Sequence, residues 1–199
     1  IQEKYYTGVP DVVADYMAEI SKITGRNYAP FAYYGAEDAT DVIVAMGSVT
    51  EAIEETVDYL NDNGRKVGLV TVHLYRPFSD KHFFAAMPKS VERIAVLDRT
   101  KENGSIGEPL YLDVKAAYYG TDNQPLILGG RYGLSSKDTT PGQIVAVFDN
   151  LVGEKKDRFT IGIEDDVNHT SLKEVDVDVQ SEDTTELLFY GFGSDGTVG

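Results

Sequence analysis

The sequence predicts an α/β fold, a three-layer sandwich in which a mainly parallel β-sheet lies between two layers of helices. The first observation is a regular alternation, between residues 41 and 151, of short apolar runs with amphipathic stretches of helical spacing. Such alternation is typical of βαβ units, whose crossovers place helices on both faces of a parallel sheet. The second observation is that three of the helical stretches begin with a capping pattern, which indicates a helix start independently of hydrophobic spacing.

The expected elements can be placed along the chain from these patterns. A first helix spans about residues 10 to 24, because apolar residues recur there at helical spacing and Gly25 ends the pattern. One face of this helix should be buried. Residues 159–163 are compatible with one more short strand, and residues 186–192 with the first strand of a further unit. Between these segments we expect strands at 41–46, 66–74, 93–98 and 125–130 and helices at 48–64, 81–87, 105–119 and 140–151.

Capping chemistry supports three of these helix starts. In a capping box, a hydroxyl side chain accepts a hydrogen bond from an early backbone N–H, and an acid or amide three residues later returns the bond. Pro141, at the first helical position, presets the backbone angle φ at no cost in hydrogen bonds. The three boxes pair Ser48 with Glu51, Ser105 with Glu108, and Thr140 with Gln143.

Composition excludes several classes of function. The 199 residues are 42% hydrophobic and 26% charged, as in an ordinary globular protein, and their formal net charge is −15. Sequence-independent nucleic-acid binding is disfavoured, because it depends on lysine and arginine neutralising phosphates. The chain has no cysteine, which excludes disulfides, thiolate catalysis and cysteine-ligated zinc or iron–sulfur sites from these residues. No apolar stretch is long enough to span a membrane and no signal peptide opens the chain, so a soluble, cytoplasmic protein is expected.

Acidic residues are concentrated between Glu164 and Glu186, where Lys173 is the only opposing charge. This segment is either a solvated connection or a surface complementary to a basic partner or a neighbouring domain. The change in pattern predicts four parts: a helical lead-in over 1–40, an α/β domain over 41–155, an acidic connector over 156–186, and the start of a next domain over 187–199.

The sequence shows no self-contained active site. The three histidines, His73, His82 and His169, form no i, i+4 pair or shared motif, so no metal site is predicted. A G-x-S-x-G elbow and a Walker A loop are also absent from the sequence. No catalytic residue is therefore assigned.

Two loops are candidates for holding an anion at the carboxyl edge of the sheet, where open α/β folds bind ligands. The first, residues 46–48, joins a strand to a helix. The second, within residues 129–143, brings Arg131 and Lys137 together with glycines and hydroxyls. Arg131 could grip a phosphate or carboxylate with two parallel hydrogen bonds, and Lys137 could act as a mobile point charge. The alternative is that Arg131 pairs with an acid of this chain and the glycines only turn the loop.

A third glycine pattern lies at the end of the sequence. Gly191, Gly193 and Gly196 match G-x-G-x-x-G directly after the apolar run 187–190. The dinucleotide fingerprint also needs a following helix, which directs its positive end at the pyrophosphate, and an acid roughly 20 residues further on. Only Thr197, Val198 and Gly199 follow the last glycine. A dinucleotide site is therefore not predicted here.

Five stretches, taken as a set, resemble pyruvate:ferredoxin (flavodoxin) oxidoreductase. The resemblance covers nearly the whole chain and implies an internal piece of a longer polypeptide. This piece is the second domain, similar to the Rossmann-like carboxyl-terminal domain of transketolases, together with the connector and the opening strand of the third domain. The stretches are LYRPFS (74–79), AVLDRTKENGSIGEPLYLDV (95–114), GGRYGLSSKD (129–138), GIEDDVNHTSL (162–172) and GFGSDGTVG (191–199).

This resemblance implies oxidative decarboxylation of pyruvate with coenzyme A, giving acetyl-coenzyme A and carbon dioxide. In the family, thiamine diphosphate and iron–sulfur clusters lie in other domains of the polypeptide, which is expected to be a homodimer that passes electrons to ferredoxin or flavodoxin. The fragment alone is expected to be an inactive scaffold. The resemblance places these residues near coenzyme A phosphates: Gly193, Ser194, Asp195, Gly196 and Thr197, with Arg131 and Lys137 as further candidates.

Two other functions are left open by the sequence. One is a free-standing α/β module that captures an anionic metabolite or coenzyme A through the GGRYGLSSK loop. The other is the transketolase-like β subunit of a 2-oxoacid dehydrogenase, which the set RTKENGSIGEP and GSDGTVG disfavours.

Overall fold

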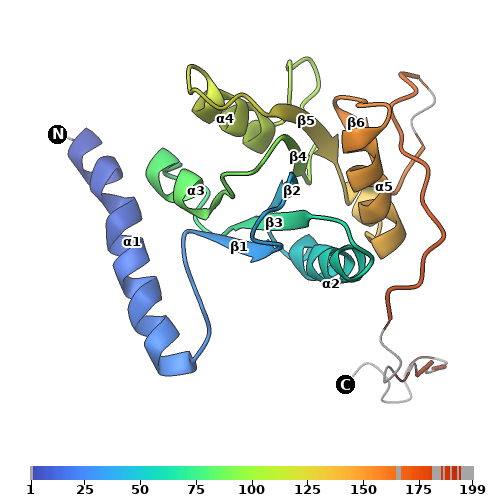
Figure 1. The fold of residues 1–199 in the computed structure, drawn as a ribbon, viewed down its shortest axis with the longest axis horizontal. Coiled ribbons are helices and arrows are strands. Elements are labelled where there is room, and N and C mark those ends of the chain that lie inside the picture. Colours follow the sequence, from blue (N-terminus) through green and yellow to red (C-terminus); the bar gives the residue numbers. More distant parts are fainter. Residues whose placement is uncertain are drawn as a thin grey trace.

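The computed structural model describes residues 2–164, 167–180, 185, 187–188, 190–191 and 193. A six-stranded sheet, with strand order β1-β3-β2-β4-β5-β6, forms the centre of the fold (Figure 1). The strands are β1 (Phe31–Gly35), β2 (Asp41–Ala45), β3 (Val67–Val72), β4 (Arg93–Asp98), β5 (Leu126–Arg131) and β6 (Phe159–Thr160). The helices are α1 (Glu3–Thr24), α2 (Val49–Asp62), α3 (Asp80–Ala86), α4 (Pro109–Tyr118) and α5 (Pro141–Val152), with a short 3₁₀ turn η1 (Leu134–Ser136).

The sheet is mainly parallel, as the sequence predicts. All neighbouring pairs from β3 to β6 run in parallel, and only β1 is antiparallel, with Phe31 opposite Val72. β1 lies in the segment expected to be a helical lead-in, and the sequence patterns did not reveal it. Its five residues are too few for a periodic signal, and Phe31 is the only one of them that is buried.

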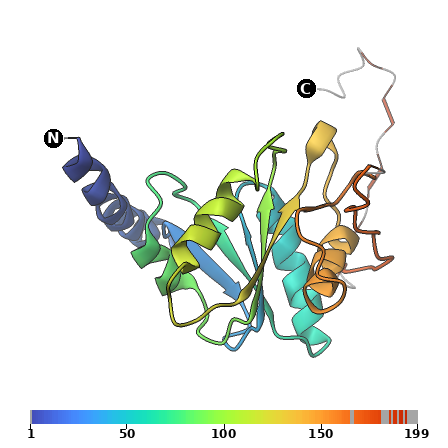
Figure 2. The same ribbon diagram turned by 90° about the horizontal axis from the view of Figure 1, so that it is seen from above.

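Two hydrophobic cores lie on opposite faces of the sheet, which confirms the three-layer sandwich. One core packs α2 and α5 against one face and includes Ile53, Phe148 and Phe159. The other packs α3 and α4 against the opposite face and includes Phe83 and Leu110. Figure 2 shows the sheet between the two helix layers. Since strands β2 and β3 are buried along their whole length, their apolar runs contribute side chains to both cores.

The first helix differs from the prediction in length and in burial. It begins at Glu3, and Gly25 ends it in the left-handed conformation, as expected for a helix C-terminus. The expected buried face is wrong within the described residues, because Pro10 is the only buried residue of α1 and Tyr16 and Ile23 are 64% and 84% exposed. Figure 1 shows α1 extending away from the sandwich. Hydrophobic spacing predicts that a face is apolar, but not what covers it.

Only one of the three predicted capping boxes forms its hydroxyl cap, and its return bond is absent because Gln143 Oε1 has no hydrogen-bond partner among the described residues. The Thr140 side chain accepts from Gln143 N, and Pro141 opens α5, both as predicted. Ser48 has helical backbone angles and makes no side-chain cap to α2. The predicted helix start at Ser105 is also wrong, because α4 begins at Pro109 and the Ser105 hydroxyl donates to Gly107 O.

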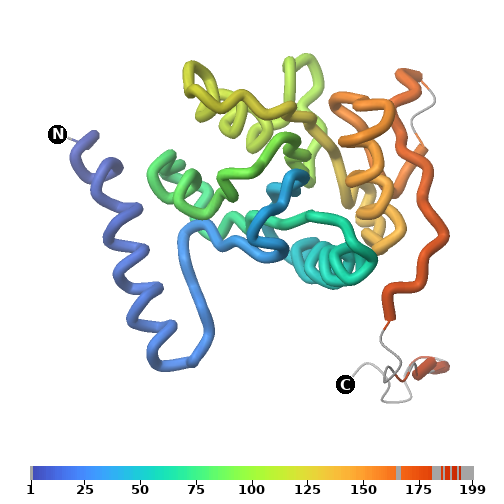
Figure 3. Tube along the Cα trace, viewed as in Figure 1, coloured from blue at the N-terminus to red at the C-terminus, as the bar shows by residue number. Residues whose placement is uncertain are grey.

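The chain after α5 returns to the sheet and then runs along that helix (Figure 3). β6 is shorter than the predicted strand at 159–163. Val175 N donates to Gly142 O, and Leu172, Val175 and Val177 pack against the core, so residues 172–177 of the acidic connector are docked on the domain beside α5. The predicted strand at 186–192 lies partly outside the described residues, and Leu187, Leu188, Tyr190 and Gly191 are not in a strand. The division of the chain into four parts stays a prediction.

Candidate functional site

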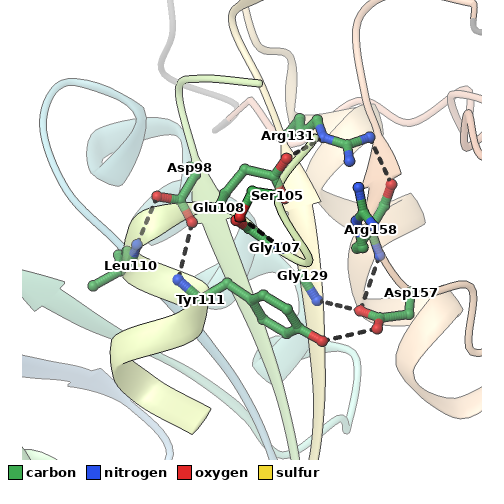
Figure 4. Close-up of polar contacts among 10 residues, drawn as sticks. All are labelled: Asp98, Ser105, Gly107, Glu108, Leu110, Tyr111, Gly129, Arg131, Asp157 and Arg158. Carbon is green, nitrogen blue, oxygen red and sulfur yellow. Dashed lines mark hydrogen bonds and ion pairs between the residues drawn. The ribbon is translucent and has the colours of Figure 1, made fainter. Parts of the chain in front are cut away.

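Arg131 is the last residue of β5, and its guanidinium is engaged inside the chain (Figure 4). Its Nε donates to Glu108 Oε1 at 2.7 Å, and a second nitrogen donates to Arg158 O at 2.9 Å. Both partners of the ion pair are buried, with side chains 4% and 1% exposed. Of the two roles that the sequence leaves open, the geometry corresponds to the one in which Arg131 pairs with an acid of this chain.

Asp98, the last residue of β4, holds the start of α4. Its carboxylate accepts from the backbone N–H of Leu110 at 2.9 Å and of Tyr111 at 3.1 Å, so it satisfies two of the early donors of α4, a role that the sequence pattern had suggested for Ser105 at an earlier helix start. Burial raises the pKa of Asp98, while the two N–H bonds act in the opposite direction. Asp98 was not predicted as a functional residue, and the available signal was an acid at the carboxyl end of a buried strand.

A second acid, Asp157, joins α4 to the sheet. Its carboxylate accepts from the Tyr111 hydroxyl at 2.8 Å and from Gly129 N at 2.8 Å. Burial and the bond to Asp157 both raise the pKa of Tyr111, which therefore stays protonated as a donor. We call the buried residues Asp98, Glu108, Tyr111 and Arg131, together with the exposed Asp157 at their margin, the buried polar network. Its members tie β4, β5, α4 and the segment before β6 together.

The two glycines before Arg131 allow close packing within this network. A Cβ atom built on Gly130 would lie 2.3 Å from Phe159 Cζ and 2.7 Å from Leu97 Cδ2. A Cβ atom on Gly129 would lie 3.0 Å from the Tyr111 ring. Both glycines belong to β5, within the strand predicted at 125–130, and they let the aromatic rings pack onto the strand.

A cavity of about 230 Å³ lies beside the network, at the carboxyl edge of the sheet. We call it the edge cavity. Both loops that the sequence singled out contribute to it, and the Tyr132 hydroxyl links them by donating to Met46 O at 3.0 Å. Arg99 also lines it and was missed; the signal was a cation directly after a strand that ends at this edge. The lining residues are Ser48, Val49, Ala52, Arg99, Tyr132, Gly133, Lys137, Asp138 and Thr139.

The predicted site residues are therefore only partly brought together. Lys137 lines the edge cavity, whereas the Arg131 side chain is directed into the buried polar network. Gly193 is exposed and has a φ of 78°. Ser194, Asp195, Gly196 and Thr197 lie outside the described residues.

Two of the three histidines, His73 and His82, take part in ordinary polar contacts. His73 Nδ1 lies 2.8 Å from Ala29 O, and His82 Nε2 lies 2.8 Å from Asp11 Oδ1. In the part of the chain that the structure describes, no group of three or more His, Cys, Asp or Glu side chains could hold a metal ion. Within the same residues, no helix is both long and apolar enough to cross a membrane.

The comparisons with family models and with curated proteins agree on one family. Residues 39–144 match the model of the pyruvate:ferredoxin oxidoreductase core domain II. A pyruvate-flavodoxin oxidoreductase of Enterobacter agglomerans is 60% identical over 98% of this chain and 17% of that protein. A pyruvate:ferredoxin oxidoreductase of Moorella thermoacetica is 53% identical over the same shares of the two chains. The chain thus spans about a sixth of the length of these curated relatives.

One solved structure also matches part of the chain. It is the 2-oxoglutarate:ferredoxin oxidoreductase from Magnetococcus marinus with 2-oxoglutarate, coenzyme A and succinyl-CoA bound. The match has a TM-score of 0.46 and 22% sequence identity, and it covers 64% of this chain and 20% of that chain.

Proposed function

Because the chain belongs to the family of the pyruvate:ferredoxin oxidoreductase core domain II, we propose that it is a non-catalytic internal domain of an enzyme that oxidises pyruvate. The observation that carries the proposal is 60% identity to a pyruvate-flavodoxin oxidoreductase over 98% of this chain. In the proposed reaction, the complete cytoplasmic enzyme converts pyruvate and coenzyme A to acetyl-coenzyme A and carbon dioxide, and passes two electrons to ferredoxin or flavodoxin.

The buried polar network supports a structural role for this domain. Its charged groups hydrogen-bond to one another and to backbone groups, so they fix the positions of α4, β5 and the segment before β6. A catalytic acid or base must reach a substrate proton. Glu108 and Arg131 are buried and directed at each other, which favours a role in positioning the domain rather than in proton transfer.

The residues of this chain do not fit the resident cofactors that the family implies. Iron–sulfur clusters are held mainly by cysteine thiolates, and the chain has no cysteine. Thiamine diphosphate is bound through a divalent metal ion, and the described residues offer no group of three ligands for one. We therefore assign both groups to other domains of the polypeptide, and derive no step of the reaction through them.

Coenzyme A is the one family ligand that we keep near this chain. Its phosphates are proposed to lie near the backbone of Gly193, Ser194, Asp195, Gly196 and Thr197. Successive N–H groups of a glycine-rich segment can bind phosphate oxygens without a cationic side chain. The complete enzyme is proposed to be a homodimer, in which this domain contacts other domains of the same polypeptide.

Two assays test the proposal. The full-length polypeptide should reduce flavodoxin or ferredoxin when pyruvate and coenzyme A are supplied together. The purified 199-residue chain should show no heat of binding with thiamine diphosphate in calorimetry. Tight binding of thiamine diphosphate to the 199-residue chain, or a full-length polypeptide that fails to oxidise pyruvate, would contradict it.

A further inference from the structure

The edge cavity places two cations at one site without an acidic partner for either. Arg99 and Lys137 are exposed and line the cavity. In the described residues, neither side chain forms an ion pair or a side-chain hydrogen bond. Acidic partners are abundant in this chain, because its 33 acids outnumber its 18 lysines and arginines. Among the described residues, seven other cationic residues are paired with acids: Arg65, Lys66, Arg76, Lys81, Arg93, Arg131 and Lys156.

The side chain of Arg99 lies against the loop after β5. Gly133 has a φ of 60°, and a Cβ atom built on it would lie 3.0 Å from Arg99 Nε and 3.2 Å from Arg99 Cγ. A glycine at this position therefore satisfies the left-handed backbone and also leaves room for the guanidinium. The arginine guanidinium is planar and rigid. Packing of the aliphatic part of the side chain therefore restricts the directions in which the guanidinium can donate hydrogen bonds.

The opposite wall of the cavity supplies further donors. Ser48 and Val49, at the start of α2, both line it. The Ser48 hydroxyl makes no cap to α2, so it can serve a ligand instead. The first N–H groups of the helix add partial positive charge on the same side. Asp138 also lines the cavity, which lowers the net positive charge of the lining and favours a compact anion over a polyanion.

The volume limits the size of the ligand. About 230 Å³ is below the roughly 300–1,000 Å³ that drug-sized ligands occupy. The planar guanidinium of arginine and the ammonium group of lysine both donate charge-assisted hydrogen bonds to phosphate oxygens. We propose that the edge cavity binds a single phosphate group, either free phosphate or the phosphate of a small monoester. Arg99 and Lys137 are its charged donors. The inference does not depend on which 2-oxoacid the complete enzyme oxidises.

Nuclear magnetic resonance titration of the ¹⁵N-labelled 199-residue chain tests this site. The probes are inorganic phosphate and, separately, glycerol phosphate; the amides of Val49 and Gly133 are the reporters. Both probes should give saturable shifts at these amides, and the probe that saturates at the lower concentration distinguishes free phosphate from a phosphate monoester. Arg99→Gln and Lys137→Gln should each raise the dissociation constant about tenfold or more, because each removes a charge-assisted hydrogen bond.

Lys101→Gln is the matched control. It removes an exposed cation close in sequence to Arg99 that does not line the cavity, so it should leave the dissociation constant within about twofold. The replaced side chains are exposed, and dispersed spectra will verify that each variant is folded. If one variant fails to fold, the other still tests the proposal. Absence of saturable shifts up to about 10 mM of either probe, or unchanged affinity in both cavity variants, would overturn it.

Discussion

Two neighbouring groups of charged side chains lie at the carboxyl edge of this sheet, and they differ in what satisfies them. In the buried polar network, each carboxylate accepts and the Arg131 guanidinium donates within the chain, and Glu108 Oε2 is the one carboxylate oxygen that is buried without a partner among the described residues. In the edge cavity, Arg99 and Lys137 stay exposed, with no acidic partner in the described residues. Burial decides the difference, since an unpaired charge is costly in the interior and inexpensive at the surface. The first group should therefore matter for stability and the second for binding.

The largest expected effect follows from breaking the buried ion pair. Arg131→Met leaves the Glu108 carboxylate buried without its partner, and should lower the free energy of unfolding by about 3–5 kcal/mol. Urea denaturation of the 199-residue chain measures this value. The double variant Glu108→Leu/Arg131→Met is the control, and should recover most of the loss because no unpaired charge remains. A loss below about 1 kcal/mol in the single variant would show that the pair does not stabilise the fold.

The second-largest loss of stability is expected from overpacking a glycine position of β5. Gly130→Ala should cost about 1–3 kcal/mol, because the new methyl group meets Phe159 and Leu97 well inside contact distance. The matched control is Gly129→Ala, whose methyl group meets the Tyr111 ring at 3.0 Å and requires a smaller shift. Thermal unfolding of both variants checks the order. A Gly129 variant that is the less stable of the two would contradict the packing described for the network.

The pH dependence of the free energy of unfolding should show the contribution of Asp98 to stability. Because the folded-state pKa of Asp98 is raised by burial, the folded protein binds a proton in a pH range where the unfolded chain has released it. The contribution of Asp98 to stability should therefore fall as the pH rises from about 3.8, its ordinary pKa, through the raised value. The measurement is the unfolding free energy of the wild type minus that of Asp98→Asn, which cannot titrate.

This difference should decrease with rising pH in that window and then become constant. Subtracting the variant removes the contributions of the other carboxyl groups. Asp11 and Asp38 titrate in the opposite sense, because lysine partners lower their pKa values. An increase of the difference with pH would mean that the two N–H bonds to Asp98 outweigh its burial.

The smallest effect is expected in the edge cavity. Arg99→Gln and Lys137→Gln should each change the free energy of unfolding by no more than about 0.5 kcal/mol, because both side chains are exposed. The same denaturation experiment as for Arg131→Met provides the comparison. A loss above about 1 kcal/mol would assign these cations to the fold, and would remove the distinction between the two groups.

Most of the sandwich could be predicted because its signals are local. The buried strands β2, β3, β4 and β5 are apolar runs of strand length, and α2 and α5 follow helical spacing. The start of α4 could not be predicted from its own sequence, because its cap comes from Asp98 in the preceding strand. The packing of α1 could not be predicted from local sequence patterns either. Its apolar face is visible in the sequence, but its partner is not among the described residues.

The sequence predicted where the candidate site lies better than it predicted which residues form it. The rule that ligands bind at the carboxyl edge of parallel strands identified both loops that line the edge cavity. It could not distinguish Arg131 from Arg99, although both lie at the end of a strand. Arg131 is the last residue inside β5 and reaches the buried Glu108, whereas Arg99 follows the last residue of β4 and reaches solvent. One position along a strand changes the face to which a side chain points.

The most direct test of a structural role for this domain is a turnover measurement on the full-length polypeptide carrying Glu108→Leu/Arg131→Met. If the buried pair only supports the fold, the folded variant should reduce flavodoxin or ferredoxin from pyruvate and coenzyme A with a kcat within about twofold of the wild type. A folded variant whose kcat falls about a hundredfold or more would place this pair in the chemistry, and would contradict a non-catalytic domain.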